Sequence, residues 1–351
     1  MTVRRIARIC AALAAFVLCA TLVPAASNAA ASAPTYQHYV ALGDSYAAGP
    51  LIPLPRLDPL LCVRSTNDYA ALLASHLGLW SYTDNTCSGA DTSNMTGSQS
   101  LVLGSHAPQF DGLTAATDLV SISIGGNDYS VFGSIVGTCP GLKDSDPTGA
   151  PCKAHFTVNG TDTLLAALAN TKTNITTVLN GIHQRSPHAK VLVVGYPRLT
   201  PTSGYCADLP LADGDYAWAD SLERALNAAA SSAAAATGST FVDTYGPSLG
   251  HDVCAGDVAW VNGKDLNLLA AAPYHPFYAG MAAEASLAYN VLAGQPASAG
   301  TAQQAFAAAQ ATQRLQPKAV DPNTAKLAKL LGLHNGAPLS PTAQQALFPT
   351  H

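Results

Sequence analysis

Short runs of apolar residues alternate along the chain with longer stretches in which apolar positions recur every three or four residues. The short runs predict buried strands at 38–42, 118–124, 190–194 and 240–242. The longer stretches predict helices at 67–77, 162–185, 213–237 and 277–292. Asn67 is the expected cap of the first helix, and Gly238 the stop of the third. Because strands and helices alternate, we expect an α/β protein whose parallel sheet carries helices on both faces.

Other segments depart from this alternation. Residues 50–66 contain four prolines, and residues 133–160 are rich in Gly, Pro and Asp, so we expect both to be loops. Residues 295–351 are rich in Ala, Gln and Pro and have no strand pattern. Within them, Asp321 and Gly332 bracket a predicted short helix. We expect this helix to pack on the core or on a partner; a peripheral contact with lipid is the alternative.

The first 31 residues are predicted to be a secretory signal peptide. A basic start precedes an apolar run from Ile9 to Val23, and small residues at 25–33 place the cleavage near 29–33. The run is shorter than the about 20 residues of a membrane span, although an uncleaved anchor is the alternative. The mature chain would be extracellular, with one large domain over 34–294 and an extension over 295–351, helical in part.

Charge narrows the range of partners. The 351-residue chain has a net charge of −5, but residues 34–294 hold 10 basic and 21 acidic residues, a net charge of −11. An acidic domain without a basic cluster argues against nucleic acid as a partner. The glycine motifs of P-loop and dinucleotide-binding proteins are absent from the sequence. We expect a monomer that needs no cofactor.

Six cysteines follow the signal peptide: Cys62, Cys87, Cys139, Cys152, Cys206 and Cys254. An even number in an exported chain predicts three disulfide bonds, and the spacing alone leaves their pairing open. Because no Cys-x-x-Cys pair occurs in the sequence, we expect no metal site.

Open α/β sheets place their functional sites at the carboxyl ends of the strands. Ser45 follows the first strand, and its hydroxyl could act as a nucleophile if a base removed its proton. His275 precedes Pro276, where the last helix of the domain begins, and could be that base. The alternatives are that Ser45 caps a helix and that His275 is a capping or surface residue.

Two further positions could stabilise a developing negative charge. Asn127 follows Gly125 and Gly126 after a predicted strand, and Gly89 could donate a backbone N–H without a side chain in the way. An Asn amide and backbone N–H groups are the donors that an oxyanion requires. The alternative is that both are ordinary turn residues.

Four blocks of sequence carry a family resemblance: Val40–Gly49, Cys87–Thr92, Ser123–Asp128 and Ala272–Pro276. In this order they resemble the GDSL, or SGNH, hydrolase family, and in particular its secreted actinobacterial lipase and esterase branch. The resemblance implies a flavodoxin-like three-layer αβα sandwich with a mainly parallel sheet of about five strands. It also implies that Ser45 is the nucleophile and His275 the general base. The backbone N–H groups of Ser45 and Gly89 and the side chain of Asn127 would form the oxyanion hole.

The sequence departs from the family at one position. Many members have an aspartate three residues before the histidine, where this chain has Ala272. We therefore expect the Ala272 carbonyl to accept the Nδ1–H of His275, which leaves a Ser–His dyad. Asp252, Asp257 and Asp265 are alternative acids. For the cysteines, the resemblance implies the sequential pairs Cys62–Cys87, Cys139–Cys152 and Cys206–Cys254.

These features together predict a secreted serine ester hydrolase, a lipase or esterase that acts on a small-molecule or lipid ester through an acyl-enzyme. An apolar loop follows Ser45 and either forms the wall of an acyl groove or packs on the core; its residues are Leu51, Ile52, Leu54, Leu57, Leu60 and Leu61. The alternatives are a carbohydrate acetylesterase or an acyltransferase that uses the same site, and a secreted binding protein without catalytic activity.

Overall fold

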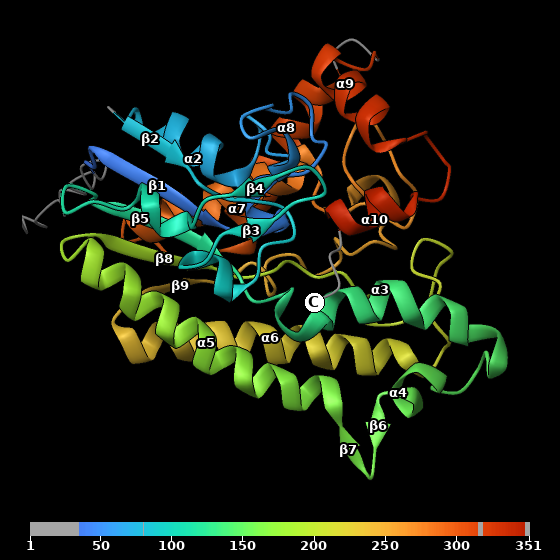
Figure 1. Cartoon of the computed structure of the whole chain (residues 1–351). Helices are drawn as coiled ribbons and strands as arrows, with labels where there is room; N and C mark the ends of the chain where they lie inside the picture. Colours follow the sequence, from blue (N-terminus) through green and yellow to red (C-terminus); the bar gives the residue numbers. More distant parts are fainter. Residues whose placement is uncertain (1–34, 80, 315–318, 348–351) are drawn as a thin grey trace, which may run out of the picture. The chain divides into compact units, whose positions relative to one another are not determined.

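The computed structural model describes residues 35–79, 81–314 and 319–347. Its centre is a five-stranded parallel sheet with the order β2-β1-β5-β8-β9 (Figure 1). The strands are β1 (His38–Gly43), β2 (Ser81–Asp84), β5 (Leu119–Ser123), β8 (Lys190–Val194) and β9 (Thr240–Val242). Counted along the chain, this is the 2-1-3-4-5 order of flavodoxin-like folds. The predicted fold class is therefore confirmed, and the predicted signal peptide lies outside the described residues.

Four helices cover the sheet, two on each face (Figure 1). They are α2 (Tyr69–Leu77) and α7 (Tyr278–Leu292) on one face, with α5 (Thr163–Arg185) and α6 (Asp215–Thr237) on the other. Alternate side chains of β1 point to opposite faces of the sheet. Val40 and Leu42 pack in a cluster with the C-terminal half of α5, whereas Tyr39 and Ala41 pack in the cluster that contains α2 and α7.

The ends of the helices follow short polar and glycine signals. Asp162 caps α5. Gly238 ends α6 in a left-handed conformation, as predicted. The predicted cap of α2 is wrong by one residue. The Asp68 side chain accepts the N–H of Ala71 at 2.7 Å, while the Asn67 side chain donates to the carbonyl of Pro53. Asp68 is fully buried at the helix start, a position that Asn67 does not share.

The loop predicted at 133–160 is wrong in part, because it contains helices α3 (Val131–Leu142) and α4 (Pro151–His155). The glycines and Pro140 of α3 lower the intrinsic helix propensity of its sequence. Packing overrides that preference, since Val131 and Ile135 are buried in the core. A short hairpin, β6 (Thr157–Val158) and β7 (Thr161–Asp162), leads from α4 into α5.

Three disulfide bonds join Cys62 to Cys87, Cys139 to Cys152 and Cys206 to Cys254, the pairs that the family resemblance implies. The first pair is fully buried and links the apolar loop after Ser45 to the segment of Gly89. The second pair links α3 to α4. Between the Gly89 segment and β5 lies a second small hairpin, β3 (Gln99–Ser100) and β4 (Ser105–His106).

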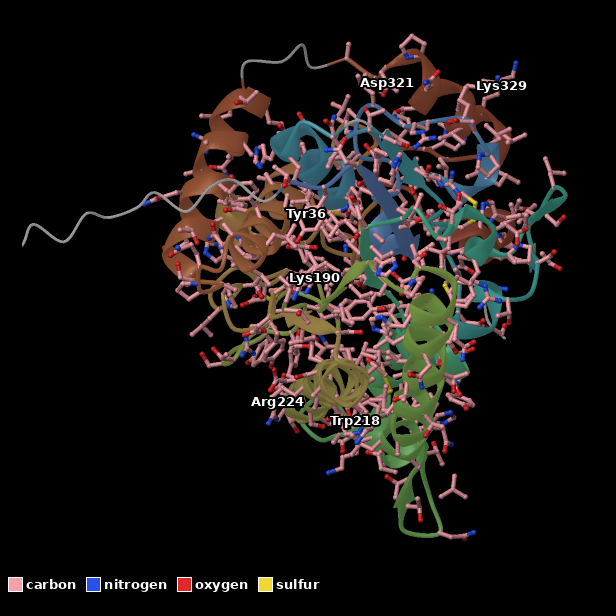
Figure 2. All side chains as sticks on the ribbon, turned by 90° about the vertical axis from the view of Figure 1, so that its left-hand side faces the viewer. Tyr36, Lys190, Trp218, Arg224, Asp321 and Lys329 are labelled. Atoms are coloured by element: carbon pink, nitrogen blue, oxygen red, sulfur yellow. A yellow bond between two sulfur atoms is a disulfide. The ribbon has the colours of Figure 1, made fainter. Side chains whose placement is uncertain are left out.

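The described residues of the C-terminal extension form helices α8 (Ala299–Arg314), α9 (Pro322–Leu331) and α10 (Pro341–Leu347). α9 is the predicted short helix. Asp321 caps it and Gly332 ends it; Asp321 and Lys329, labelled in Figure 2, mark its first and last turns. Leu327 and Leu331 of α9 are buried, so the helix packs on the protein as expected. In the described part of the chain, no helix has the length and apolar character required to cross a membrane.

Candidate active site

Ser45 begins the short helix α1 (Ser45–Ala48) at the carboxyl end of β1. The turn before it requires glycine, because Gly43 has a φ of +140° and a Cβ there would lie 2.3 Å from the Ser123 carbonyl oxygen. Asp44 caps α1 by accepting the N–H of Tyr46 at 2.9 Å. The capping residue is therefore Asp44, which leaves the Ser45 hydroxyl available for another role.

A buried polar network holds this turn. The Gln109 side chain accepts the N–H of Gly43 at 2.8 Å and donates to the Gly43 carbonyl at 2.9 Å. The Tyr196 hydroxyl donates to the Asp44 carboxylate and accepts the N–H of Gly126 at 3.0 Å. Burial raises the pKa of Asp44 to about 7. The network links the turn of Ser45 to the glycine turn that precedes Asn127.

Asn127 and the segment of Gly89 lie together, as the resemblance implies. The Asn127 side chain donates to the Ala90 carbonyl at 2.9 Å, and the neighbouring Asp128 carboxylate accepts the N–H of Thr92 at 2.9 Å and its hydroxyl at 2.8 Å. Gly89 has a φ of +77°. Asn127 also lines a small buried cavity of about 40 Å³ together with Ser45. Asn127 is thus near both the serine and the glycine segment.

His275 is fully buried, and its Nδ1 lies 2.7 Å from the Pro273 carbonyl oxygen. The expected acceptor, the Ala272 carbonyl, is therefore a wrong prediction. That carbonyl accepts the backbone N–H of His275 at 3.3 Å and the Asn262 side chain at 3.1 Å. The chain makes a tight turn here, in which Tyr274 has a φ of +57°. The turn directs the Ala272 carbonyl to the backbone and brings the imidazole to Pro273.

Two of the three alternative acids, Asp252 and Asp265, have other partners. The Asp265 carboxylate is 2.8 Å from the Lys264 ammonium, and the Asp252 carboxylate accepts the N–H of Cys254 at 3.0 Å. The Nδ1 of His275, where an orienting acid would bind, is occupied by the Pro273 carbonyl. A carbonyl at Nδ1 fixes the imidazole tautomer in which Nε2 can accept a proton.

Tyr46 connects the serine turn to the histidine turn. Its hydroxyl donates to the Tyr274 carbonyl at 2.7 Å, and its ring centroid lies 5.3 Å from that of His275. Phe132 of α3 lies 6.4 Å from the imidazole centroid. Burial lowers the pKa of His275 to about 4, although its hydrogen bond to Pro273 opposes this shift. The imidazole is therefore neutral over most of the pH range.

Sequence reasoning did not identify the supporting residues Tyr46, Gln109 and Tyr196. Tyr46 stands directly after Ser45 in the first block, so its position was a usable signal. Gln109 lies in a loop far along the chain from Gly43, and no local pattern indicates their contact. Among the described residues, one cluster has the spacing of metal ligands, but its cysteines, Cys62 and Cys87, are joined in a disulfide bond.

Comparisons with known proteins identify the family of the chain. The sequence profile of the GDSL-like lipase/acylhydrolase family matches residues 41–283. Lipase 2 of Streptomyces coelicolor is 40% identical over 249 residues, which cover 68% of this chain and 81% of that protein. The lipase of Streptomyces rimosus is 34% identical over 275 residues, which cover 78% of this chain and 93% of that protein.

Solved structures show the same similarity. A phospholipase A1 from Streptomyces albidoflavus superposes with a TM-score of 0.60 at 27% identity, over 73% of this chain and 98% of that one. The extracellular lipase of Streptomyces rimosus gives a TM-score of 0.56 at 30% identity, over 73% of this chain and 99% of that one. The fold and these relatives together define a carboxylic ester hydrolase built on a parallel α/β sheet. The chain belongs to the GDSL-like lipase/acylhydrolase family.

Proposed function

We propose that this protein is a secreted serine esterase or lipase that cleaves carboxylic esters through an acyl-enzyme on Ser45, with His275 as the base. The observation that carries the proposal is the geometry of His275. Its Nδ1 is bonded to the Pro273 carbonyl, and its ring lies against Tyr46, the residue next to Ser45. A buried imidazole that is held at Nδ1 and packs on the residue next to a helix-initiating serine supports proton transfer from the hydroxyl to Nε2.

The reaction would proceed in two stages. In the first, the Ser45 hydroxyl attacks the ester carbonyl while Nε2 of His275 removes its proton. The tetrahedral oxyanion is stabilised by the N–H groups of Ser45 and Gly89 and by the Asn127 amide. His275 then protonates the leaving alcohol, and the acyl group remains on Ser45. In the second stage, His275 activates a water molecule, which releases the acid and restores the hydroxyl.

The Pro273 carbonyl takes the place of the aspartate of a triad. It orients the imidazole as a carboxylate would, but it carries no full negative charge to stabilise the imidazolium that forms during catalysis. Burial of His275 also disfavours the imidazolium and lowers the pKa of this residue to about 4. The site would therefore act as a dyad of Ser45 and His275.

Secretion is supported by two observations. The three disulfide bonds are typical of a protein that folds in an oxidising compartment. The Streptomyces rimosus protein of solved structure, which is 30% identical to this chain, is described as an extracellular lipase. Since the relatives include lipases and a phospholipase A1, we propose that the substrates carry apolar acyl groups.

The test is hydrolysis of p-nitrophenyl esters of increasing acyl length by the wild type, Ser45→Ala and His275→Ala. Each variant should lose about 10⁴-fold or more in kcat, as other serine hydrolases do when the nucleophile or base is removed. Ser203→Ala and His334→Ala are matched controls at exposed positions and should retain wild-type rates. Full activity in Ser45→Ala would contradict the mechanism. An inactive wild type on every ester would favour a binding protein.

A further inference from the structure

The C-terminal extension lies beyond the family profile, which ends at residue 283, yet it contacts both segments that lead to the candidate active site. The Asn323 side chain donates to the Pro55 carbonyl at 2.8 Å, in the loop that follows Ser45. The Asn335 side chain accepts the N–H of Leu268 at 2.7 Å, in the segment that leads to His275. The extension is therefore hydrogen-bonded to the loop that follows Ser45 and to the segment that precedes His275.

Apolar packing reinforces these contacts. Leu51, Leu61 and Val63 from the loop after Ser45 share one buried cluster with Leu327, Leu331 and Leu347 of the extension. Leu266, Leu268 and Ala272 from the segment before His275 belong to the same cluster. Of the apolar loop that follows Ser45, Leu51 and Leu61 therefore pack against the extension, Ile52 packs in the core, and Leu54 is exposed. We therefore looked for an apolar surface that the loop and the extension do not already fill.

One such surface is a groove of about 550 Å³ that is lined by α3 and by residues 338–345 of the extension. Helices α3 and α10, which contribute to it, are labelled in Figure 1. We call this groove the α3–α10 groove. Val136 and Pro140 line it from α3, and Leu339 and Pro341 line it from the extension. Pro273, whose carbonyl binds Nδ1 of His275, lines it as well. The groove therefore adjoins the turn that orients the imidazole.

The groove also adjoins the serine. Phe132 and Ile135 of α3 line the small cavity that contains Ser45, whereas the next residue after each, Gly133 and Val136, lines the groove. The two spaces thus lie on adjacent faces of α3. A substrate whose carbonyl reached Ser45 could pass its chain along α3 and past the His275 turn into the groove.

The lining of the groove suits an aliphatic chain. Prolines, glycines and aliphatic side chains predominate, and among the described residues that line it Lys264 alone carries a charge, which is paired with Asp265. The volume lies within the range of about 300–1,000 Å³ that is usual for small-molecule sites. Gly133 and Gly137 open the floor, since a Cβ at either position would meet nothing within 4 Å.

We propose that the α3–α10 groove binds the acyl chain of the ester and that the C-terminal extension, by forming its second wall, sets the preferred chain length. The proposal rests on the ester hydrolysis proposed above. Each methylene that enters an apolar groove should raise kcat/KM by roughly three- to fourfold. The gain should continue until the chain reaches the end of the groove.

The test narrows the groove from each side. Gly137→Leu would fill it from α3, and Gln344→Trp from the extension, since Gln344 is exposed and lines it. Both should reduce kcat/KM for dodecanoate and longer p-nitrophenyl esters by about tenfold or more, which is the loss of two to three methylenes. Hydrolysis of the acetate and butyrate should stay within about twofold of the wild type.

Matched controls lie on the same two helices. Gly141→Leu adds the same side chain to α3, and Thr342→Trp adds the same ring to α10, at exposed positions that do not line the groove. Both should keep the wild-type dependence on chain length. An unchanged dependence in Gln344→Trp, with normal butyrate hydrolysis, would overturn the inference and leave the proposed function intact. A wild-type protein that hydrolyses none of the esters would instead count against the proposed function.

A second series separates the acyl chain from the alcohol. Acetate esters of alcohols of increasing length place the growing chain on the leaving group instead of the acyl group. The groove variants should leave this series unchanged. If Gly137→Leu and Gln344→Trp impaired the long alcohols and spared the long acyl groups, the groove would bind the leaving group and the assignment to the acyl chain would be wrong.

Discussion

The turns that carry Ser45, Asn127 and His275 differ in construction from the C-terminal extension that packs beside them. In the turns, buried hydrogen bonds between side chains and backbone fix each position, as Gln109 does for Gly43 and Pro273 for His275. In the extension, a cluster of leucines and alanines provides most of the buried contacts. Hydrogen bonds have strict geometry and apolar packing tolerates substitution. We therefore assign the proposed chemistry to the turns and the shape of the groove to the extension.

After Ser45→Ala and His275→Ala, the largest effect should come from a donor in the turns. Asn127→Ala removes the amide that would bind the oxyanion, and we expect kcat to fall by about 10²–10³-fold with little change in KM. The change also removes the hydrogen bond to Ala90, so thermal unfolding must be measured beside the kinetics. A normal kcat in folded Asn127→Ala would assign this residue to the structure of the turn alone.

A matched exposed asparagine is Asn159, which lies in the β6–β7 hairpin. Asn159→Gly should leave kcat unchanged, because the residue has a φ of +51° that glycine adopts readily. The pair of variants shows whether loss of an amide affects the rate only where the amide faces the cavity of Ser45.

The next prediction concerns the apolar packing of the C-terminal extension. Leu327→Ala in α9 truncates a fully buried side chain, and we expect it to lower the free energy of unfolding by about 2–4 kcal/mol. Because α9 makes no part of the proposed chemistry, kcat for the butyrate ester should stay near the wild-type value. Chemical denaturation and initial rates measure the two quantities separately.

Lys326→Ala, an exposed neighbour on the same helix, is the control and should change stability by less than about 0.5 kcal/mol. A large fall in butyrate kcat for folded Leu327→Ala would show that packing of the extension also sets the position of Ser45 or His275. The division between the two regions would then be wrong.

How far the sequence predicts the protein also differs between these regions. The central strands are continuous apolar runs, and the three blocks around Ser45, Asn127 and His275 place glycine or proline where a turn requires it. Periodicity and motif therefore predicted most of the sheet and the candidate residues. The acceptor for His275 was missed because the φ of Tyr274, +57°, decides which carbonyl meets the imidazole. That angle depends on contacts far along the chain, such as the one with Tyr46.

The extension was predicted less well for a physical reason. α8 and α10 are rich in Ala and Gln, so their sequences hold few large apolar residues to reveal a buried face. α9 was predicted because Asp321 and Gly332 mark its ends. The edge strand β2 was missed because its sequence, Ser-Tyr-Thr-Asp, lacks an apolar run.

The third effect concerns pH. Burial lowers the pKa of His275 to about 4, so we expect the proposed base to stay neutral and active as the pH falls from 7 to 5. At pH 5, kcat/KM should be about 30-fold higher than a histidine with the ordinary pKa of about 6.5 would allow. The acid limb of log kcat/KM should lie near pH 4 instead of pH 6.5.

The ionisation of two buried carboxyl groups would add a separate limb to the pH profile of kcat/KM. Burial raises the pKa of Asp44 and of Glu223 to about 7, and both line the cavity that contains Ser45. The profiles of Asp44→Asn and Glu223→Gln separate their ionisation from that of His275. An acid limb near pH 6.5 that persists in both variants would mean that the imidazole is more solvated during turnover than its burial indicates.

The smallest effect should come from the charged residue of the groove. Lys264 pairs with Asp265, and their side chains are 39% and 62% exposed; such surface pairs contribute about 0–1 kcal/mol. If the groove holds an aliphatic chain, Lys264→Gln should change kcat/KM for dodecanoate and butyrate esters by the same factor, within about twofold. Lys329→Gln on α9 is the control. A selective loss of about tenfold on one substrate class would mean that the ammonium recognises a polar group of the substrate. The groove would then recognise polar groups as well, and the contrast between polar turns and an apolar groove would be wrong.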